Sequence, residues 1–189
     1  MLLFSCDWGG EAVTVLQTLI TSKTRIKLLL KFFLNIQNRG YLKKLEVEFA
    51  DSSNGIRLEL NKLEEAGLLR SSLEGNKKYF EANTSNPIYQ EIHSLLRKYT
   101  GLDQLVEKVL NQIGELQTAY LTGTLACGLQ SDRIEILLIG DLNQAYLDEL
   151  IVKAEKLMAK TITYQVFPAF EFQIKKEQLL AQPHILLFG

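Results

Sequence analysis

The 189-residue chain has little cysteine, no strong net charge and no long hydrophobic run. Its two cysteines, Cys6 and Cys127, are too few and too far apart for a disulfide framework or a zinc site, and we expect no metal and no cofactor. The formal net charge of −1 excludes a generic binder of polyanions. The longest membrane-like stretch, residues 26–36, is interrupted by Lys31 and is too short to span a bilayer.

The first residues also lack the features of a signal peptide. The stretch "MLLFSCDWGGEAV" has no basic segment and reaches Asp7 before any long apolar run. A content of 47% hydrophobic and 23% charged residues is typical of a soluble globular protein. These features predict a cytoplasmic protein with no membrane partner.

Charge is distributed unevenly along the chain. Residues 21–85 hold 12 Lys and Arg against 8 Asp and Glu, whereas the remainder holds 9 against 14. A mildly basic segment suits nucleic acid, so a nucleic-acid contact is expected in the first half of the chain.

The first 84 residues carry the signals of several helices followed by a hairpin. Ser22 and the turn "DSSNG" supply helix caps, and Gly67 stands where helices commonly end. Residues 74–76 are a hairpin turn signal between two short strands. The expected helices are a weak one over 11–21, then 23–37, 41–50 and a third strong helix from the turn to residue 66; the expected strands are 68–73 and 77–82.

Helix, helix, helix and hairpin over residues 22–84 is the order of a winged helix. The stretches "KTRIKLLLKFF", "LNKLEEAGLLRSS" and "GNKKYFEAN" resemble the corresponding parts of ArsR-type winged helix-turn-helix regulators, and "LNKLEEAGLL" is the most specific part. The resemblance implies a winged-helix domain over residues 1–84 in a transcriptional regulator that binds double-stranded DNA.

The helix that starts after the "DSSNG" turn has an apolar face formed by Ile56, Leu60 and Leu63. Arg57 and Asn61 point away from that face, and these residue types can pair with guanine and adenine through two hydrogen bonds. Lysines just after the hairpin turn suit phosphate groups. The candidate DNA-binding residues are Ser53, Asn54, Arg57, Leu58, Asn61, Lys62, Lys77 and Lys78.

The same helix also fits a protein partner. Glu59, Glu64 and Glu65 lower its positive potential, and Leu58 on the outward side suits a thymine methyl group or a protein equally. The alternative interpretation is therefore a winged-helix protein-interaction module that does not bind DNA.

Residues 85–117 are expected to form two connecting helices, because no linker rich in Pro, Gly or Ser separates the two halves of the chain. Asn86 is the expected N-cap of the first, with Pro87 at its first helical position. The second, over 102–117, carries an apolar stripe of Leu102, Leu105, Val106, Val109, Ile113 and Leu116. Such a stripe predicts a homodimer that buries it, together with the N-terminal helix.

Residues 118–189 are expected to form a small domain with the order strand, strand, helix, strand. The stretches "GTLACG" and "DRIEILLIG" resemble the signature of the minimal nucleotidyltransferases of the DNA polymerase β-like superfamily. Gly123 and Thr124 take the Gly-Ser positions and Gly128 takes the second glycine, and the resemblance covers about residues 118–170. The whole chain is thus expected to be α+β.

The catalytic part of that signature is damaged. The chemistry needs two carboxylates at i and i+2 on one strand, where they hold Mg²⁺ against a triphosphate. Those positions hold Arg133 and Glu135, and Asp132 would lie on the opposite face from Glu135. The later strand "TITYQVF" supplies no third acid. We therefore expect no catalytic residue and no enzyme activity.

Two interpretations of this domain follow, and active nucleotidyl transfer is the alternative to both. In the first, the domain is a scaffold for dimerisation. In the second, it is a sensor that binds a small anionic or nucleotide ligand through Gly123, Thr124, Arg133 and Glu135. With either, the sequence predicts a sequence-specific, DNA-binding transcriptional regulator.

Overall fold

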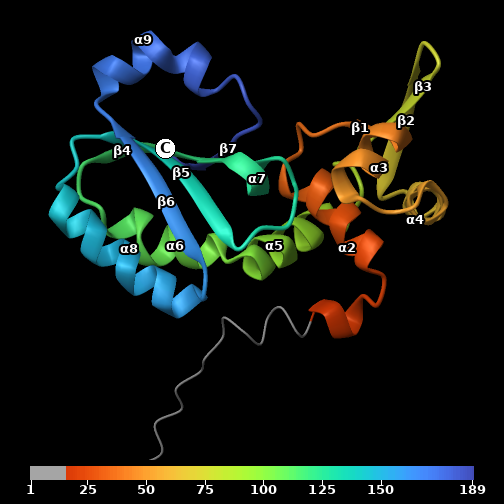
Figure 1. Ribbon diagram of the computed structural model, residues 1–189, viewed down its shortest axis with the longest axis horizontal. Coiled ribbons are helices and arrows are strands. Elements are labelled where there is room, and N and C mark those ends of the chain that lie inside the picture. The colour runs from red at the N-terminus through yellow and green to blue at the C-terminus, as the bar shows by residue number, and fades with distance from the viewer. Residues whose placement is uncertain (1–15) are drawn as a thin grey trace, which may run out of the picture.

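The computed structural model describes residues 16–189 (Figure 1). Cys6, Trp8 and residues 11–15 of the first expected helix lie outside the described residues, while residues 16–19 are helical. The fold is α+β, as predicted, with one three-stranded and one four-stranded sheet in the described part. No helix among residues 16–189 is long and apolar enough to cross a membrane.

Residues 23–82 contain the three α-helices α2, α3 and α4 and a small antiparallel sheet, drawn from orange to yellow in Figure 1. The strands lie in the order β1-β3-β2. The hairpin of β2 and β3 is therefore joined to the helical part by the pairing of β3 with the short strand β1. The elements are α2 (Lys23–Leu29), β1 (Gly40–Tyr41), α3 (Leu42–Phe49), α4 (Ser53–Glu65), β2 (Leu69–Glu74) and β3 (Lys77–Ala82).

The ends of these helices lie where the local signals predict. The Ser22 hydroxyl accepts a hydrogen bond from the Arg25 amide at the start of α2, and Ser52 does the same for Gly55 at the start of α4. Gly67, just after α4, has a φ of 69°, a left-handed conformation that glycine adopts at low cost.

The hairpin turn consists of Gly75 and Asn76, because Glu74 pairs with Lys77. Gly75 has a φ of 57° and occupies the first central position, where a two-residue hairpin turn favours glycine. The predicted turn is confirmed.

The helix predicted over residues 23–37 is shorter than expected. Its last turn is a π-helix, η1 (Leu30–Leu34), and Asn35 is already extended. The Asn35 side chain accepts a hydrogen bond from the Gln37 amide and donates to carbonyl groups of the C-terminal part. These bonds compete with a helical continuation, so the prediction of helix through Gln37 was wrong.

The first connecting helix, α5 (Tyr89–Thr100), starts later than predicted, because Ile88 rather than Asn86 is its N-cap residue. Asn86 accepts a hydrogen bond from the Ile88 amide and donates one to the Gly67 carbonyl oxygen. Asn86 therefore joins the start of α5 to the end of α4 instead of capping a helix.

The second connecting helix, α6 (Leu102–Lys108), ends well before residue 117 and is followed by a single 3₁₀ turn, η2 (Leu110–Gln112). The next strand begins at Leu116, which pairs with Gly140. The spacing of the apolar residues fits a long helix, but strand pairing far along the chain determines where the helix ends. The prediction of helix over residues 109–117 was wrong.

The second half contains a four-stranded sheet with the order β6-β5-β4-β7, in which only β5 and β6 are parallel. The predicted order strand, strand, helix, strand is present, but α7, α9 and β7 were not predicted. The elements are β4 (Leu116–Thr122), α7 (Gly123–Ala126), β5 (Arg133–Gly140), α8 (Gln144–Met158), β6 (Thr161–Phe167), α9 (Ala169–Leu179) and β7 (Ile185–Phe188).

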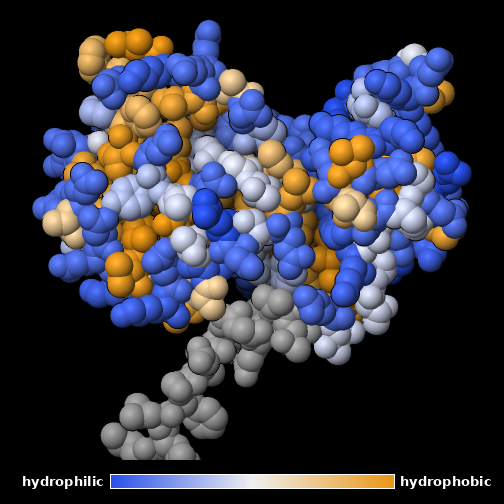
Figure 2. All heavy atoms as spheres, viewed as in Figure 1, coloured by the Kyte–Doolittle hydropathy of each residue, from blue (hydrophilic) through white to orange (hydrophobic). Residues whose placement is uncertain are grey.

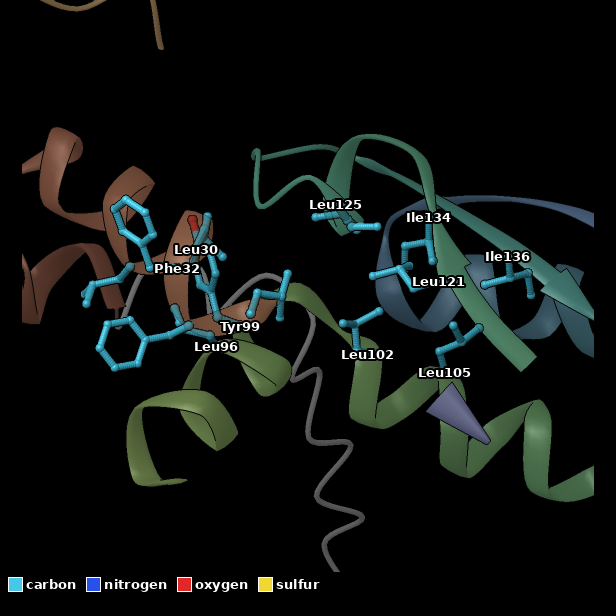
Figure 3. Packing of buried hydrophobic residues seen from close by; sticks show 14 of the residues in the cluster. Leu30, Phe32, Leu96, Tyr99, Leu102, Leu105, Leu121, Leu125, Ile134 and Ile136 are labelled. Atoms are coloured by element: carbon cyan, nitrogen blue, oxygen red, sulfur yellow. The ribbon is translucent and has the colours of Figure 1, made fainter. Parts of the chain in front are cut away.

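Helices cover both faces of this sheet, with α6 and α8 on one side and α9 on the other (Figure 1). Figure 3 shows Leu102 and Leu105 of α6 pointing toward Leu121, Ile134 and Ile136 of the sheet. These residues belong to one continuous core that reaches from the first helices to β6. The apolar stripe of α6 is therefore buried inside the chain rather than left free for a second copy.

Candidate nucleic-acid interface

Helix α4 presents the face that the sequence predicts. Ile56, Leu60 and Leu63 are buried in the core, and Arg57 and Asn61 are exposed on the other side. Asn54, Leu58 and Lys62 are also exposed, whereas Ser53 is half-buried. The helix is thus anchored on one side and free to contact a partner on the other.

A groove of about 620 Å³ lies between α3, α4 and the hairpin, and it brings five of the eight predicted residues together. Leu60 and Phe80 provide apolar contacts in it, and Glu46 is an acidic residue on its edge. The predicted residues that line it are Ser53, Arg57, Asn61, Lys77 and Lys78.

The other three predicted residues lie outside this groove. Leu58 is 52% exposed on the outward side of α4, and Asn54 is exposed near its first turn. Lys62 borders a different, mainly apolar groove with Leu63 and Leu95. Of these three, Lys62 is the one that the structure places toward α5 instead of the hairpin.

The basic residues of the groove differ in their partners. Within the described chain, Arg57 and Lys77 form no ion pair, and the Lys77 ammonium lies 4.6 Å from the centre of the Tyr41 ring. Lys78 instead contacts Glu64 of α4 at 2.7 Å. Hydrogen bonds from Lys78 and Ser71 hold the pKa of Glu64 below its ordinary value. Arg57 and Lys77 are therefore the cations most available to an anionic partner.

Contrary to the prediction, Glu59 does not lower the positive electrostatic potential on the outward face of α4. It is only 9% exposed, and its carboxylate is 2.7 Å from the Arg25 guanidinium of α2. Burial alone would raise the pKa of Glu59, but hydrogen bonds from Arg25 and Ser22 and the Arg25 charge hold it below its ordinary value. The predicted role of Glu59 was wrong because the carboxylate faces α2.

Arg39 holds the hairpin, and the sequence analysis missed it. Its guanidinium donates to Glu74 at 2.6 Å and to Ser72 at 2.9 Å, and it lies 3.0 Å from Glu81. It also stacks over the Tyr79 ring at 5.1 Å. The sequence signal for this contact was an acidic residue on each of the two paired hairpin strands, Glu74 and Glu81, together with the preceding Arg39. Arg39 therefore links the segment before β1 to both strands of the hairpin.

Glu46 is a second residue that the sequence analysis missed, and it lines the groove beside α4. A hydrogen bond from Ser53, together with the nearby Lys43, holds the pKa of Glu46 below its ordinary value. A negative charge at this edge disfavours a phosphate there, so an anionic partner would approach Arg57 from the hairpin side.

The four predicted ligand residues of the C-terminal half do not all converge. Gly123 and Glu135 line a groove of about 350 Å³ on the sheet, whereas Thr124 and Arg133 are not part of its lining. Arg133 and Glu135 pair with Thr161 and Thr163 of the parallel neighbour β6, so no second acid stands beside Glu135 on these strands. Within residues 16–189, no group of three or more His, Cys, Asp or Glu is placed to hold a metal ion.

Comparison with known proteins finds no matching family model, no matching curated protein and no matching solved structure. The site geometry is therefore the basis for a functional proposal. The hairpin projects from the body and its surface is mostly hydrophilic, next to the exposed face of α4 (Figures 1 and 2).

Proposed function

We propose that the protein is a sequence-specific transcriptional regulator that binds double-stranded DNA through an ArsR-type winged helix over residues 1–84. The observation that carries this proposal is the groove in which exposed Arg57 and Asn61 of α4 lie beside Lys77 of the hairpin. Residues that can read base edges and a cation that can contact phosphate thus share one surface.

In this proposal α4 enters the major groove of DNA. Its 13 residues span about 20 Å, and the major groove is about 12 Å wide, which admits an α-helix. Arg57 pairs with a guanine and Asn61 with an adenine, while Lys77 and Lys78 contact phosphates on the adjacent backbone.

A second candidate function is binding of a protein partner by the same part of the chain. Leu58 of α4, Val47 of α3 and Leu73 of the hairpin are 52%, 80% and 79% exposed. Exposed apolar side chains of this size suit a protein interface. A preference for DNA that depends on Arg57 distinguishes the two functions.

We also propose that the regulator is a homodimer whose two α4 helices meet half-sites about 34 Å apart. Because the stripe of α6 is buried within the chain, we place the interface at α5 instead. Ile88 and Leu95 are exposed there, beside an apolar groove between α2, α4 and α5. Light scattering that returns only 21.5 kDa across micromolar concentrations would refute the dimer.

The C-terminal half is proposed to be a nucleotidyltransferase-like unit without transferase activity, serving the regulator as a dimerisation scaffold or ligand sensor. Arg133 stands where the resemblance requires a metal-binding acid. Active nucleotidyl transfer remains the alternative.

The experiment that tests the DNA proposal selects binding sites from random duplexes with the full chain. Arg57→Ala is then compared with Arg133→Ala, which removes the same charge from the exposed start of β5, outside the groove. We expect only Arg57→Ala to weaken the selected site, by about 1–3 kcal/mol at fixed salt. Equal binding by both variants would reject this role of α4.

A further inference from the structure

The groove on the outer face of the C-terminal sheet is distinct from the proposed DNA-binding surface. It is bounded by β4, β5 and β6, and by residues at and just beyond the end of α9. Leu137 and Leu179 supply apolar contacts, and Thr122, Thr163, Gln165 and Gln182 supply hydroxyl and amide groups. The groove thus offers both hydrogen-bond donors and acceptors to a small molecule.

The charge of this groove is negative. Among the described residues that line it, Glu135 is the only Asp, Glu, Lys or Arg. Glu135 is a half-buried residue, and its carboxylate has no hydrogen-bond or ion-pair partner within the described chain. A carboxylate removed partly from water without a partner favours a positively charged ligand group.

Glu135 also covers the backbone that would otherwise receive an anion. A Cβ atom placed on Gly123 would lie 2.2 Å from one Glu135 carboxylate oxygen, so the carboxylate rests directly against Gly123. An anion that approached the Gly123 backbone would meet this negative charge first. Arg133, on the same face of β5, is outside the lining and makes no ion pair with Glu135.

We propose that this groove binds a small molecule with an ammonium or guanidinium group. The N–H groups of that cation donate hydrogen bonds to the Glu135 carboxylate. The hydroxyl groups of Thr122 and Thr163 and the amides of Gln165 and Gln182 contact the rest of the molecule. The site replaces the expected anion site with one of opposite charge. It does not depend on DNA binding, so failure of either proposal leaves the other standing.

The probe is agmatine, which carries one guanidinium and one ammonium group, titrated into the full chain at constant ionic strength. Backbone amide shifts in nuclear magnetic resonance spectra report the site, with Gly123, Thr163 and Gln165 as the reporters. Inorganic phosphate and ATP, without added metal, are the anionic comparisons.

Glu135→Gln keeps the shape of the side chain and breaks no hydrogen bond of the described chain, so we expect the variant to fold. Glu177→Gln is the matched control, because it removes the same charge from an exposed position on α9. We expect Glu135→Gln to weaken agmatine binding about tenfold or more and Glu177→Gln to leave it unchanged.

Salt provides a second measurement, since raising the NaCl concentration should weaken agmatine binding to the parent more than to Glu135→Gln. The proposal is overturned if agmatine leaves the three reporter amides unshifted at millimolar concentration. It is also overturned if Glu135→Gln binds agmatine as tightly as the parent, or if phosphate or ATP shifts the same amides at lower concentration.

Discussion

The side-chain amide of Asn35 donates a hydrogen bond to the backbone carbonyl oxygen of Ala126 at 2.9 Å, across 91 positions of the chain. Asn35 follows the π-helix η1, and Ala126 is the last residue of α7. The same amide donates to the His184 carbonyl oxygen at 3.2 Å. One buried side chain therefore joins the proposed DNA-binding half to two segments of the C-terminal half.

Replacing Asn35 with Ala should lower the free energy of unfolding by about 1–3 kcal/mol, because the buried Ala126 carbonyl keeps only a 3.4 Å contact from Asn38. Urea unfolding measures the change. Asn111→Ala is the control, since Asn111 is exposed and should change the stability by less than about 0.5 kcal/mol. Equal stability of the two variants would show that the Asn35 bonds do not stabilise the fold.

A second close contact between the halves occurs at Gly128. It has a φ of 74°, and a Cβ atom there would lie 2.4 Å from the Lys31 Cα atom and 2.8 Å from the Leu30 carbonyl oxygen. We expect Gly128→Ala to destabilise the protein by more than about 2 kcal/mol, through backbone strain and displacement of η1.

Gly75→Ala separates these two causes. Gly75 also has a positive φ, of 57°, but nothing lies within 4 Å of a Cβ atom placed on it. This variant should lose only about 1 kcal/mol in thermal or urea unfolding, from strain alone. If Gly128→Ala lost no more stability than Gly75→Ala, the close approach of Gly128 to the backbone of η1 would add no cost to the substitution.

The local signals of the sequence predicted most of the elements. Ser22, Gly67 and the hairpin turn act within a few residues of their own positions, and the start of α2, the end of α4 and the two hairpin strands lie where the sequence places them. The end of α6 depends instead on the pairing of Leu116 with Gly140. No local pattern reports that pairing.

Helix α9 was missed for a different reason. Within α9, Phe172 is buried but Phe170 and Ile174 are exposed, so the apolar residues of the helix mark no single buried face. For the candidate site, helical periodicity correctly separated Arg57 and Asn61 from the buried face. It could not show that Glu59 pairs with Arg25, because that contact joins two helices.

The pairing of Glu59 makes stability depend on pH. Its pKa is below the ordinary value in the folded protein, so the stabilisation is present above the unfolded pKa of about 4.3 and is lost as the pH falls through the folded pKa. The difference in unfolding free energy between the parent and Glu59→Gln should therefore be largest near pH 7 and shrink toward pH 3. Urea unfolding at several pH values measures it.

Glu65→Gln is the control for that experiment, because Glu65 is exposed on the same helix and forms no ion pair in the described chain. The unfolding free energy of the Glu65→Gln variant should equal that of the parent at every pH. A constant difference between the parent and Glu59→Gln from pH 7 to pH 3 would contradict the assignment.

For the DNA proposal, Lys77→Ala should weaken binding to all duplex sequences and lower the slope of log K against log salt by about 1. The reason is that Lys77 has no carboxylate partner in the described chain and would release about one counterion from a phosphate. Fluorescence anisotropy at several salt concentrations, with a selected and a scrambled duplex, measures both effects. Lys153→Ala, on the exposed side of α8, should leave the slope unchanged. A slope unaltered by Lys77→Ala would remove Lys77 from the interface.

The last prediction is that the C-terminal half does not transfer nucleotides. Along the outer face of β5, Arg133 precedes Glu135, and the paired residues of β6 are Thr161 and Thr163. One carboxylate beside a guanidinium cannot hold two metal ions in line or neutralise a triphosphate. Incubation of the full chain with labelled ATP, GTP, CTP or UTP, Mg²⁺ or Mn²⁺ and candidate acceptors should give no labelled product. Mn²⁺ is included because it is a second divalent ion with the same preference for oxygen ligands. Turnover that disappears in Glu135→Gln but persists in Glu177→Gln would establish catalysis at this strand and promote the enzyme alternative.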